Sequence, residues 1–247
     1  MIRLVGAELF KQRTTRTFYG LMGGAVALVL VISVLGSALG DFKHERHPLE
    51  NLVNIGGLSQ VFAVVIGVLA VTTEYRHGTI TPTLLAVPDR AKLVIGKLVA
   101  ALLIGFVLGL ACIGVVVVVA LLIFSGRGIS SGASGSDVVR FLAGGAVSAA
   151  LNAAFGVGLG AIVRNQVGAV IGVLVWGFVL EPLIGLIPGL KDVVPKWGLG
   201  GISNEVAGTS STAHAFGQVP AGLVFAGYCA ICVALGIAFM RRRDVSA

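Results

Sequence analysis

Three short groups of residues carry side chains that could bind a metal, exchange a disulfide or hold a phosphate. The histidines of His44-Glu45-Arg46-His47 are three positions apart, whereas the zinc motif His-Glu-x-x-His places them four apart on one helix face. Cys229 and Cys232 have a redox-like spacing but lie inside an apolar run, which favours buried structural residues. Gly96-Lys97 is followed by leucine, so it lacks the serine or threonine of a phosphate-binding loop. We therefore expect no catalytic, cofactor-binding or metal site in this chain.

The polar segment 73–93 has more local structure than a simple connection needs. Gly78 can end the helix before it, and Thr81 can cap a short helix that has Pro82 at its first position. Asp89 follows a proline and can cap the next helix. The pattern predicts a rigid elbow with a short helix of about a turn and a half, and its flanking charges favour a protein partner.

The side chains expected to contact such a partner are Glu74, Tyr75, Arg76, His77, Gly78, Thr79, Ile80, Leu84, Leu85, Arg90 and Lys92. We expect the charged ones to form ion pairs, and Leu84 and Leu85 to fill a groove. The alternative is an interfacial helix that has no partner.

Six apolar runs lie before and after segment 73–93 along the chain, and each is long enough to cross a bilayer as a helix. The runs are 18–39, 52–71, 98–124, 141–163, 167–190 and 219–240. Charged residues make up only 12% of the chain and its mean hydropathy is +0.99, whereas soluble domains have about 25% charged residues. The sequence therefore predicts an all-α, polytopic membrane protein in which residues 1–247 form one transmembrane domain.

The distribution of charge predicts an orientation. If both termini are cytoplasmic, twelve Lys and Arg residues lie on the inner side and six on the outer side, as the positive-inside rule requires. The net charge of +7 is then a matter of topology in the plasma (inner) membrane and does not indicate a nucleic-acid partner. Arg241-Arg242-Arg243 reads as an anchor for lipid headgroups.

Residues 1–16 and 191–218 are the other two segments with a recognisable pattern. Ile2, Val5, Leu9 and Phe10 lie near one helical face of the first segment, with Glu8 and Lys11 away from it. This predicts a helix along the inner membrane surface. The second segment mixes apolar and polar residues, which predicts short helices resting on the outer membrane face.

Polar residues within the spans are few. Gln60, Asn152 and Glu181 could line a pathway or serve the structure, and an ionisable residue inside a membrane is a functional candidate. Glu181 lies in the outer third of its span, where pairing with a loop cation or a helix terminus is the more common role. Its function is left open between these two interpretations.

Glycine pairs with four-residue spacing predict close contacts between spans. The pairs are Gly20/Gly24, Gly105/Gly109, Gly156/Gly160, Gly168/Gly172 and Gly185/Gly189. Because glycine is frequent, we expect about half of these pairs to be real contacts.

Several of these motifs resemble the membrane subunits, or permeases, of type-2 ABC (ATP-binding cassette) exporters. The resemblance rests on Glu8, Lys11, Thr14-Thr15-Arg16, Glu74-Tyr75-Arg76-His77-Gly78-Thr79-Ile80, Pro88, Arg90 and Lys97. Arg164-Asn165-Gln166, Glu181-Pro182 and Arg242-Arg243-Asp244 are similar to actinobacterial members of that family.

The resemblance implies a six-helix fold and a second permease subunit in the membrane, in a homodimer or a heterodimer. It also implies a connecting helix over residues 1–16 and a coupling helix in the elbow that docks on an ATP-binding subunit. ATP and Mg would belong to that subunit, because this chain has no phosphate-binding loop. A motor-independent secondary transporter or channel is the alternative, and it would need intramembrane ionisable residues to carry coupling ions.

Overall fold

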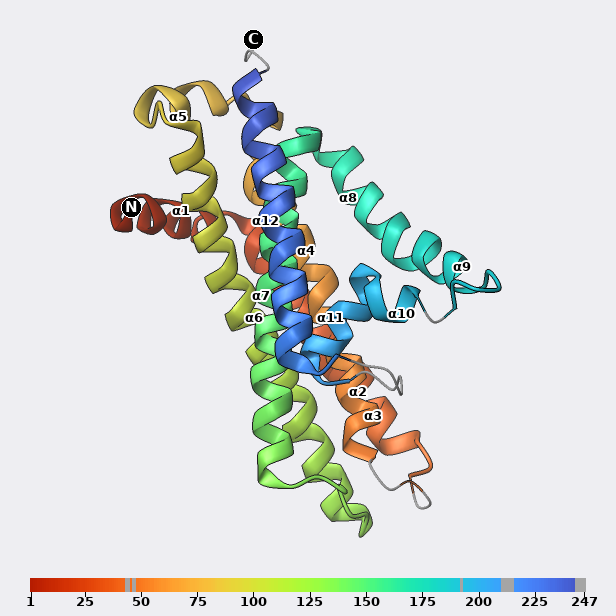
Figure 1. Ribbon diagram of the computed structural model, residues 1–247. Coiled ribbons are helices and arrows are strands. Elements are labelled where there is room, and N and C mark those ends of the chain that lie inside the picture. Colours follow the sequence, from red (N-terminus) through yellow and green to blue (C-terminus); the bar gives the residue numbers. More distant parts are fainter. Residues whose placement is uncertain (43–44, 46–47, 192, 210–215, 243–247) are drawn as a thin grey trace.

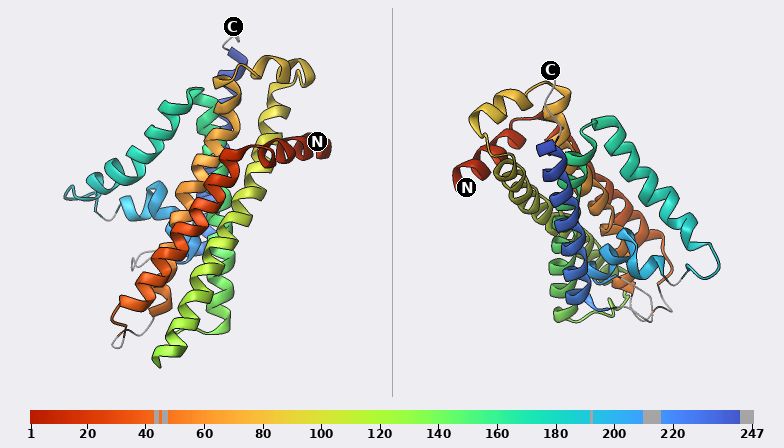
Figure 2. Two further views of the ribbon diagram at one scale, coloured as in Figure 1. Left: turned by 180° about the vertical axis from the view of Figure 1, so that it is seen from behind. Right: turned by 45° about the horizontal axis from the view of Figure 1, so that its top comes forward.

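The computed structural model describes residues 1–42, 45, 48–191, 193–209 and 216–242, and within them the chain is a bundle of long helices (Figures 1 and 2). Of the sequence groups considered above, His44, Arg46, His47, Arg243 and Asp244 lie outside the described residues.

Within the described residues, six helical units are long and apolar enough to cross a membrane, which confirms an all-α fold with six candidate spans. They are α2 (Arg16–Leu39), α3 with α4 (Pro48–Gly56 and Leu58–Arg76), α6 (Arg90–Arg127), α7 (Gly135–Val163), α8 with η1 and α9 (Gln166–Val175, Trp176–Leu180 and Glu181–Gly185), and α12 (Gln218–Arg242). With 38 residues, α6 is about 57 Å long and must project beyond a hydrocarbon core of about 30 Å.

The fifth span contains a widened turn at Trp176–Leu180 because a proline follows. Pro182 has no N–H, and its ring collides with the carbonyl four residues earlier in a regular helix. The backbone therefore widens, and the Glu181 N–H donates to the Trp176 carbonyl five residues back. The turn lies directly before Glu181, one of the polar residues that stand out in the sequence.

Glycines bring α4, α6 and α7 together at the centre of the bundle. A Cβ atom at Gly105 would lie 2.6 Å from the Ala149 carbonyl oxygen, and one at Gly156 would collide with the carbonyl of Val64. These contacts confirm the Gly105/Gly109 and Gly156/Gly160 pairs. The other three pairs bring no two spans into close contact among the described residues. Nothing lies within 4 Å of a Cβ at Gly20, Gly24, Gly172 or Gly189, a Cβ at Gly168 meets only the neighbouring Asn165, and one at Gly185 meets Val194 of the following segment at 3.9 Å.

Helix α1 (Ile2–Arg13) lies roughly at right angles to the long helices and projects from the half of the bundle in which α12 ends (Figure 1). The predicted helix is confirmed, and the contact of its apolar face with the membrane surface stays a prediction. Ile2 and Phe10 are largely exposed, whereas Glu8 is buried against the bundle. The reason is that Lys97 of α6 pairs with Glu8, so this carboxylate is stable facing inward.

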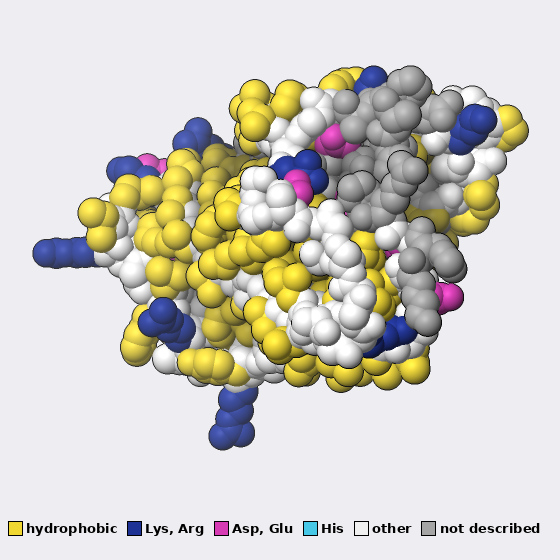
Figure 3. All heavy atoms as spheres, turned by 90° about the horizontal axis from the view of Figure 1, so that it is seen from below, with side chains coloured by type: hydrophobic (Ala, Val, Ile, Leu, Met, Phe, Trp, Pro, Cys, Tyr) yellow, Lys and Arg dark blue, Asp and Glu magenta, His cyan; other side chains and the backbone are white. Residues whose placement is uncertain are grey.

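The segment between the last two spans forms α10 (Val194–Trp197) and α11 (Leu199–Ala207), as the sequence predicts. However, α11 packs against α7 and α12 with Ile202 and Ser203 buried, so it does not simply rest on the membrane face. Viewed from below, hydrophobic side chains cover much of the visible surface, and charged side chains stand in separate places (Figure 3).

Candidate functional site

The end of α4 is a tight reversal whose hydrogen bonds fix the direction of the next segment. Gly78 has φ +66°, in the left-handed region that glycine enters without strain. Its N–H donates to the Tyr75 carbonyl at 3.4 Å, and the Thr79 N–H donates to the Glu74 carbonyl at 2.9 Å. This pair of bonds is a Schellman ending, which confirms the predicted break at Gly78.

The elbow that follows consists of α5 (Ile80–Ala86) and the start of α6. Helix α5 begins earlier than predicted, with Thr79 and not Thr81 at its N-cap. Pro82 then occupies the third helical position, where its missing N–H still costs no helical hydrogen bond. Asp89 caps α6 as predicted, because its carboxylate accepts from the N–H groups of Ala91 at 3.0 Å and Lys92 at 3.3 Å.

The two leucines of α5 face different surroundings. Leu84 is half-buried and packs on the hydrophobic core, and Ile80 beside it is buried. Leu85, the next residue along the helix, is 79% exposed. Only Leu85 is therefore fully available to a partner, while Leu84 also holds α5 on its own chain.

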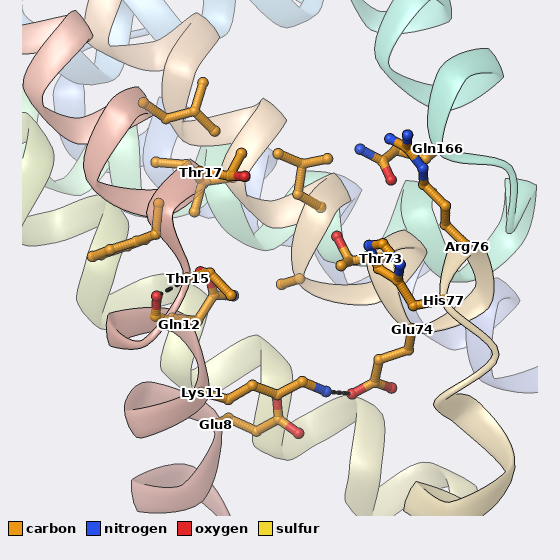
Figure 4. A pocket seen from close by; sticks show the side chains of 15 residues that line it. Glu8, Lys11, Gln12, Thr15, Thr17, Thr73, Glu74, Arg76, His77 and Gln166 are labelled. Atoms are coloured by element: carbon orange, nitrogen blue, oxygen red, sulfur yellow. Dashed lines mark hydrogen bonds and ion pairs between the residues drawn. The ribbon is translucent and has the colours of Figure 1, made fainter.

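Close to the elbow, the charged side chains of Glu8, Lys11, Glu74 and Lys97 form one ion cluster. Figure 4 shows Glu8, Lys11 and Glu74, with the Lys11–Glu74 pair dashed. The Lys97 ammonium lies 2.6 Å from Glu74 Oε1 and 2.9 Å from Glu8 Oε2, and it also donates to the Ala70 carbonyl at 3.1 Å. Lys11 pairs with Glu74 from α1. Two cations thus neutralise two carboxylates, and the cluster joins α1, α4 and α6.

The predicted contact residues of the elbow therefore divide into two groups. Glu74 is 1% exposed and held within the chain, so it does not face a partner in this structure. Arg76, His77, Gly78 and Thr79 are exposed at the end of α4. Lys92 is exposed too and pairs with Asp89 at 3.4 Å, an exposed pair of little energetic weight.

Two arginines tie the end of α12 to this region. Arg90, expected to contact a partner, donates to the Met240 carbonyl. Arg164 donates to the Phe239 carbonyl at 2.7 Å, and its guanidinium lies 5.5 Å from the centre of the Tyr75 ring. The last turns of α12 are therefore fixed to α4, α6 and α7.

The sequence pattern does not predict the pairing of Lys97 with Glu8 and Glu74. The available signal was a lysine at the root of the longest apolar run, because an ionisable residue at membrane depth usually has a partner. The partner on α1 could not be identified without knowing where α1 docks.

A second polar cluster lies far from the elbow and brings Gln60 and Asn152 together. Ser203 of α11 donates to Gln60 Oε1 at 2.8 Å, and Asn152 Nδ2 donates to Ser203 Oγ at 2.6 Å. Ser148 Oγ lies 2.9 Å from the same hydroxyl. The cluster fixes α11 between α4 and α7, and Ser203 had not been predicted to take part.

Glu181, the third polar residue predicted within the spans, caps a helix. Its Oε1 accepts the N–H of Gly200 at 2.8 Å and that of Gly201 at 3.3 Å, at the first turn of α11. A carboxylate is favoured there by the unpaired N–H groups and the helix dipole. Gln60, Asn152 and Glu181 all line one cavity of about 580 Å³ between α4, α7, the fifth span and α11.

These features define a multi-pass α-helical membrane protein with a structured elbow at one end. The chain matches a family described as ABC-2 family transporter protein over residues 4–180, well over half of its length. It therefore belongs to the ABC-2 family and is a membrane (permease) component, which is not itself catalytic. No curated protein shows significant similarity to it. The family assignment favours the ABC subunit over the motor-independent alternative.

Proposed function

We propose that this chain forms the translocation pathway of an ABC exporter and that a separate ATP-binding subunit drives it by docking on α5. The observation that carries the proposal is the rigid elbow, with an exposed leucine on one side and an ion cluster behind it. ATP and Mg belong to the docking subunit. Both termini and α5 face the cytoplasm, since this orientation puts twelve of the eighteen Lys and Arg residues inside.

The contacts around α5 supply a path for force. The Schellman ending holds α5 rigidly on α4, and the Asp89 cap holds the start of α6. The Lys97–Glu74 pair then joins α4 to α6, and Glu8 adds α1. A push on α5 therefore moves three helices as one body, which is what a coupling helix with a connecting helix beside it must do.

A second permease subunit completes the pathway in this proposal. The most apolar stretch of α2 is only 17% buried and that of the fifth span only 11%, against 61% for α7. The exposed sides of α2 and α8 are apolar, so they suit either lipid or the matching faces of another subunit. Whether that subunit is a second copy or a related chain follows from the experiment below.

The experiment is co-purification of this chain with a candidate ATP-binding cassette protein, together with ATP-driven transport in vesicles. Leu85→Asp should lower cassette recovery roughly tenfold or more, because a carboxylate buried in an interface loses its hydration. Leu39→Asp is the matched control, since Leu39 is also 79% exposed but lies at the far end of α2.

Unchanged cassette recovery and transport with Leu85→Asp would refute docking on α5. The mass of the purified complex gives the number of permease chains. ATP hydrolysis by the isolated chain would contradict the assignment of the motor to a separate subunit.

A further inference from the structure

The cavity lined by Gln60, Asn152 and Glu181 is large enough to hold a whole small molecule. Its volume is about 580 Å³, and pockets that bind small molecules usually measure roughly 300–1,000 Å³. One side of it is formed by the fifth span, the least buried of the six candidate spans among the described residues. This span leans away from the long helices, with α10 and α11 between its far end and the bundle (Figure 1). A molecule dissolved in the membrane would meet this side of the cavity first.

The walls of the cavity change from polar to apolar in the same direction. The lining of α7 runs from Asn152 to Leu159, and that of α4 runs from Gln60 to Val64. These two helices have the same direction, since successive glycines of α7 meet successive turns of α4. On the fifth span, Glu181 follows an apolar stretch and stands at the end that reaches α11. An apolar molecule with one polar group, placed with that group at α11, therefore meets matching chemistry along its length.

The polar end of the cavity is gathered by one turn of α11. Glu181 Oε1 accepts from the Gly200 N–H at 2.8 Å, and Asn152 Nδ2 donates to Ser203 Oγ at 2.6 Å. Residues three apart are neighbours on a helix surface, so Gly200 and Ser203 bring these two side chains to the same place. Gln60 joins them, because its Oε1 accepts from the Ser203 hydroxyl.

Glu181 and Asn152 each keep one acceptor oxygen that the protein does not use. Glu181 Oε2 and Asn152 Oδ1 have no hydrogen-bond partner in the described part of the chain. Neither atom is among the unpaired polar atoms that are completely buried. Both residues line the cavity, so these oxygens remain open to a ligand that brings N–H groups.

Glu181 also lacks a cationic partner. No Lys, Arg or His side chain of the described residues lies within 4 Å of its carboxylate, in contrast to the ion cluster near the elbow. The N–H groups of α11 supply only a partial positive charge. Phe155 and Trp176 line the same cavity, and the faces of aromatic rings attract cations. The cavity therefore favours a ligand with a positive charge.

We propose that this cavity binds an apolar molecule that carries one protonated amine. The ammonium donates to Glu181 Oε2 and Asn152 Oδ1, and the apolar body lies along Phe155, Leu159 and Val64. A neutral alcohol of the same shape brings no charge to Glu181, and a carboxylate of the same shape is repelled by it. The site therefore distinguishes the three by chemistry. This inference goes beyond the proposed function and does not depend on the docking of an ATP-binding subunit.

The test is quenching of Trp176 fluorescence in the purified full chain. The chain has two tryptophans, so Trp197→Phe leaves Trp176, which lines the cavity, as the only one. The probes are bromophenyl-butylamine, bromophenyl-butanol and bromophenyl-butyrate, whose bromine quenches a nearby indole. We expect the amine to bind about tenfold more tightly than the alcohol, the effect of one hydrogen bond to a charged group. Equal affinity for these two probes, or tighter binding of the butyrate, would overturn the proposal.

Two carboxylate variants locate the charge that is recognised. Glu181→Gln should remove the preference for the amine. Glu205→Gln is the matched control, because Glu205 is also 8% exposed and accepts the Gly217 N–H at 2.9 Å, but it does not line the cavity. A preference that survives Glu181→Gln, or that Glu205→Gln removes equally, would show nonspecific attraction of the cation and refute the site.

Gly172→Leu tests the cavity without touching a polar group. Gly172 lines the cavity and a Cβ there has no neighbour within 4 Å, so leucine occupies open space. It should weaken binding of the amine and the alcohol alike while the unfolding temperature is retained. Gly20→Leu is the control, since Gly20 has the same open surroundings but does not line the cavity.

Quenching that Gly172→Leu leaves unchanged would place the probes outside the cavity and overturn the proposal. Because quenching is measured without a cassette protein, a failure of docking on α5 cannot produce any of these outcomes.

Discussion

Lys97 Nζ lies 2.6 Å from Glu74 Oε1, and these two almost fully buried side chains connect the third span to the second. The same ammonium reaches Glu8 on α1, so one lysine holds three helices. A buried pair of this kind contributes little over an apolar replacement, but removing one partner leaves an uncompensated charge.

Lys97→Met should therefore destabilise the chain by about 3–5 kcal/mol, because two carboxylates then share only Lys11. The double variant Lys97→Met/Glu8→Gln restores neutrality and should recover part of this loss. Thermal unfolding in detergent measures both, with the exposed Lys92→Met as control. Equal stability of wild type and Lys97→Met would mean that the cluster does not hold the helices together.

Gly78 should tolerate asparagine but not valine. Its φ of +66° is accessible to asparagine at low cost, whereas a β-branched residue is strained there by about 1–2 kcal/mol. No side chain stands within 4 Å of a Cβ at this position, so the effect of valine comes from the backbone alone. Gly78→Val should insert normally yet lower cassette recovery and transport, and Gly78→Asn should keep both. Equal behaviour of the two variants would show that the reversal is not needed.

The local signals of the sequence predict the spans and the elbow well, because both depend on neighbours along the chain. Apolar runs must form helices in lipid, and Gly78 and Asp89 each act through backbone groups a few residues away. Helix α5 begins two residues earlier than the sequence predicts, because Thr79 directly follows the Schellman ending and becomes the N-cap. The pattern of Thr81 and Pro82 does not reveal this.

What the sequence does not predict depends on how distant helices dock. The amphipathic pattern of α1 separates Glu8 from the apolar residues but does not predict that Glu8 is buried against the bundle. Its burial is stable only because Lys97 of α6 lies opposite. In the same way, Ser203 joins Gln60 and Asn152 because α11 folds back into the bundle, and nothing in residues 191–218 specifies that depth.

Asp89 should make stability depend on pH in a predictable direction. The Lys92 backbone N–H that donates to its carboxylate lowers the pKa of Asp89, and the Ala91 N–H acts in the same sense. A lowered folded pKa means that the stabilisation is present above the unfolded pKa of about 3.9 and is lost as the pH falls through the folded value.

The comparison with Asp89→Asn isolates this effect, since asparagine caps a helix but does not titrate. The wild type should unfold at a higher temperature than Asp89→Asn at pH 7, and the difference should shrink below about pH 4. A difference that stays constant or grows on acidification would contradict the role of the charged cap.

Gly156 should be far less tolerant of leucine than Gly172, although each belongs to a glycine pair with four-residue spacing within a span. A side chain at Gly156 collides with the Val64 carbonyl of α4, whereas a Cβ at Gly172 has no neighbour within 4 Å. Gly156→Leu should therefore lower the free energy of unfolding by about 3 kcal/mol or more, the upper end of the usual cost of overpacking. Thermal unfolding and oligomer size in detergent separate loss of chain stability from loss of assembly. If only Gly172→Leu reduces the oligomer size, the face of α8 is the subunit contact and α4–α7 packing is not.

Glu181 should contribute more to the stability of the fold than to transport itself. Its carboxylate accepts two N–H groups at the start of α11, and Glu181→Leu leaves both without this acceptor. The loss should be about 1–3 kcal/mol, while Glu181→Gln, which keeps an acceptor oxygen, should lose less. Leu183→Ala is the control, because Leu183 lies on the same helix and is exposed.

Transport measured at a temperature where all variants are folded distinguishes a structural role of Glu181 from a role in the pathway. If Glu181→Leu and Glu181→Gln both abolish transport there while their unfolding temperatures match the wild type, Glu181 serves the pathway directly and its helix-capping role is secondary.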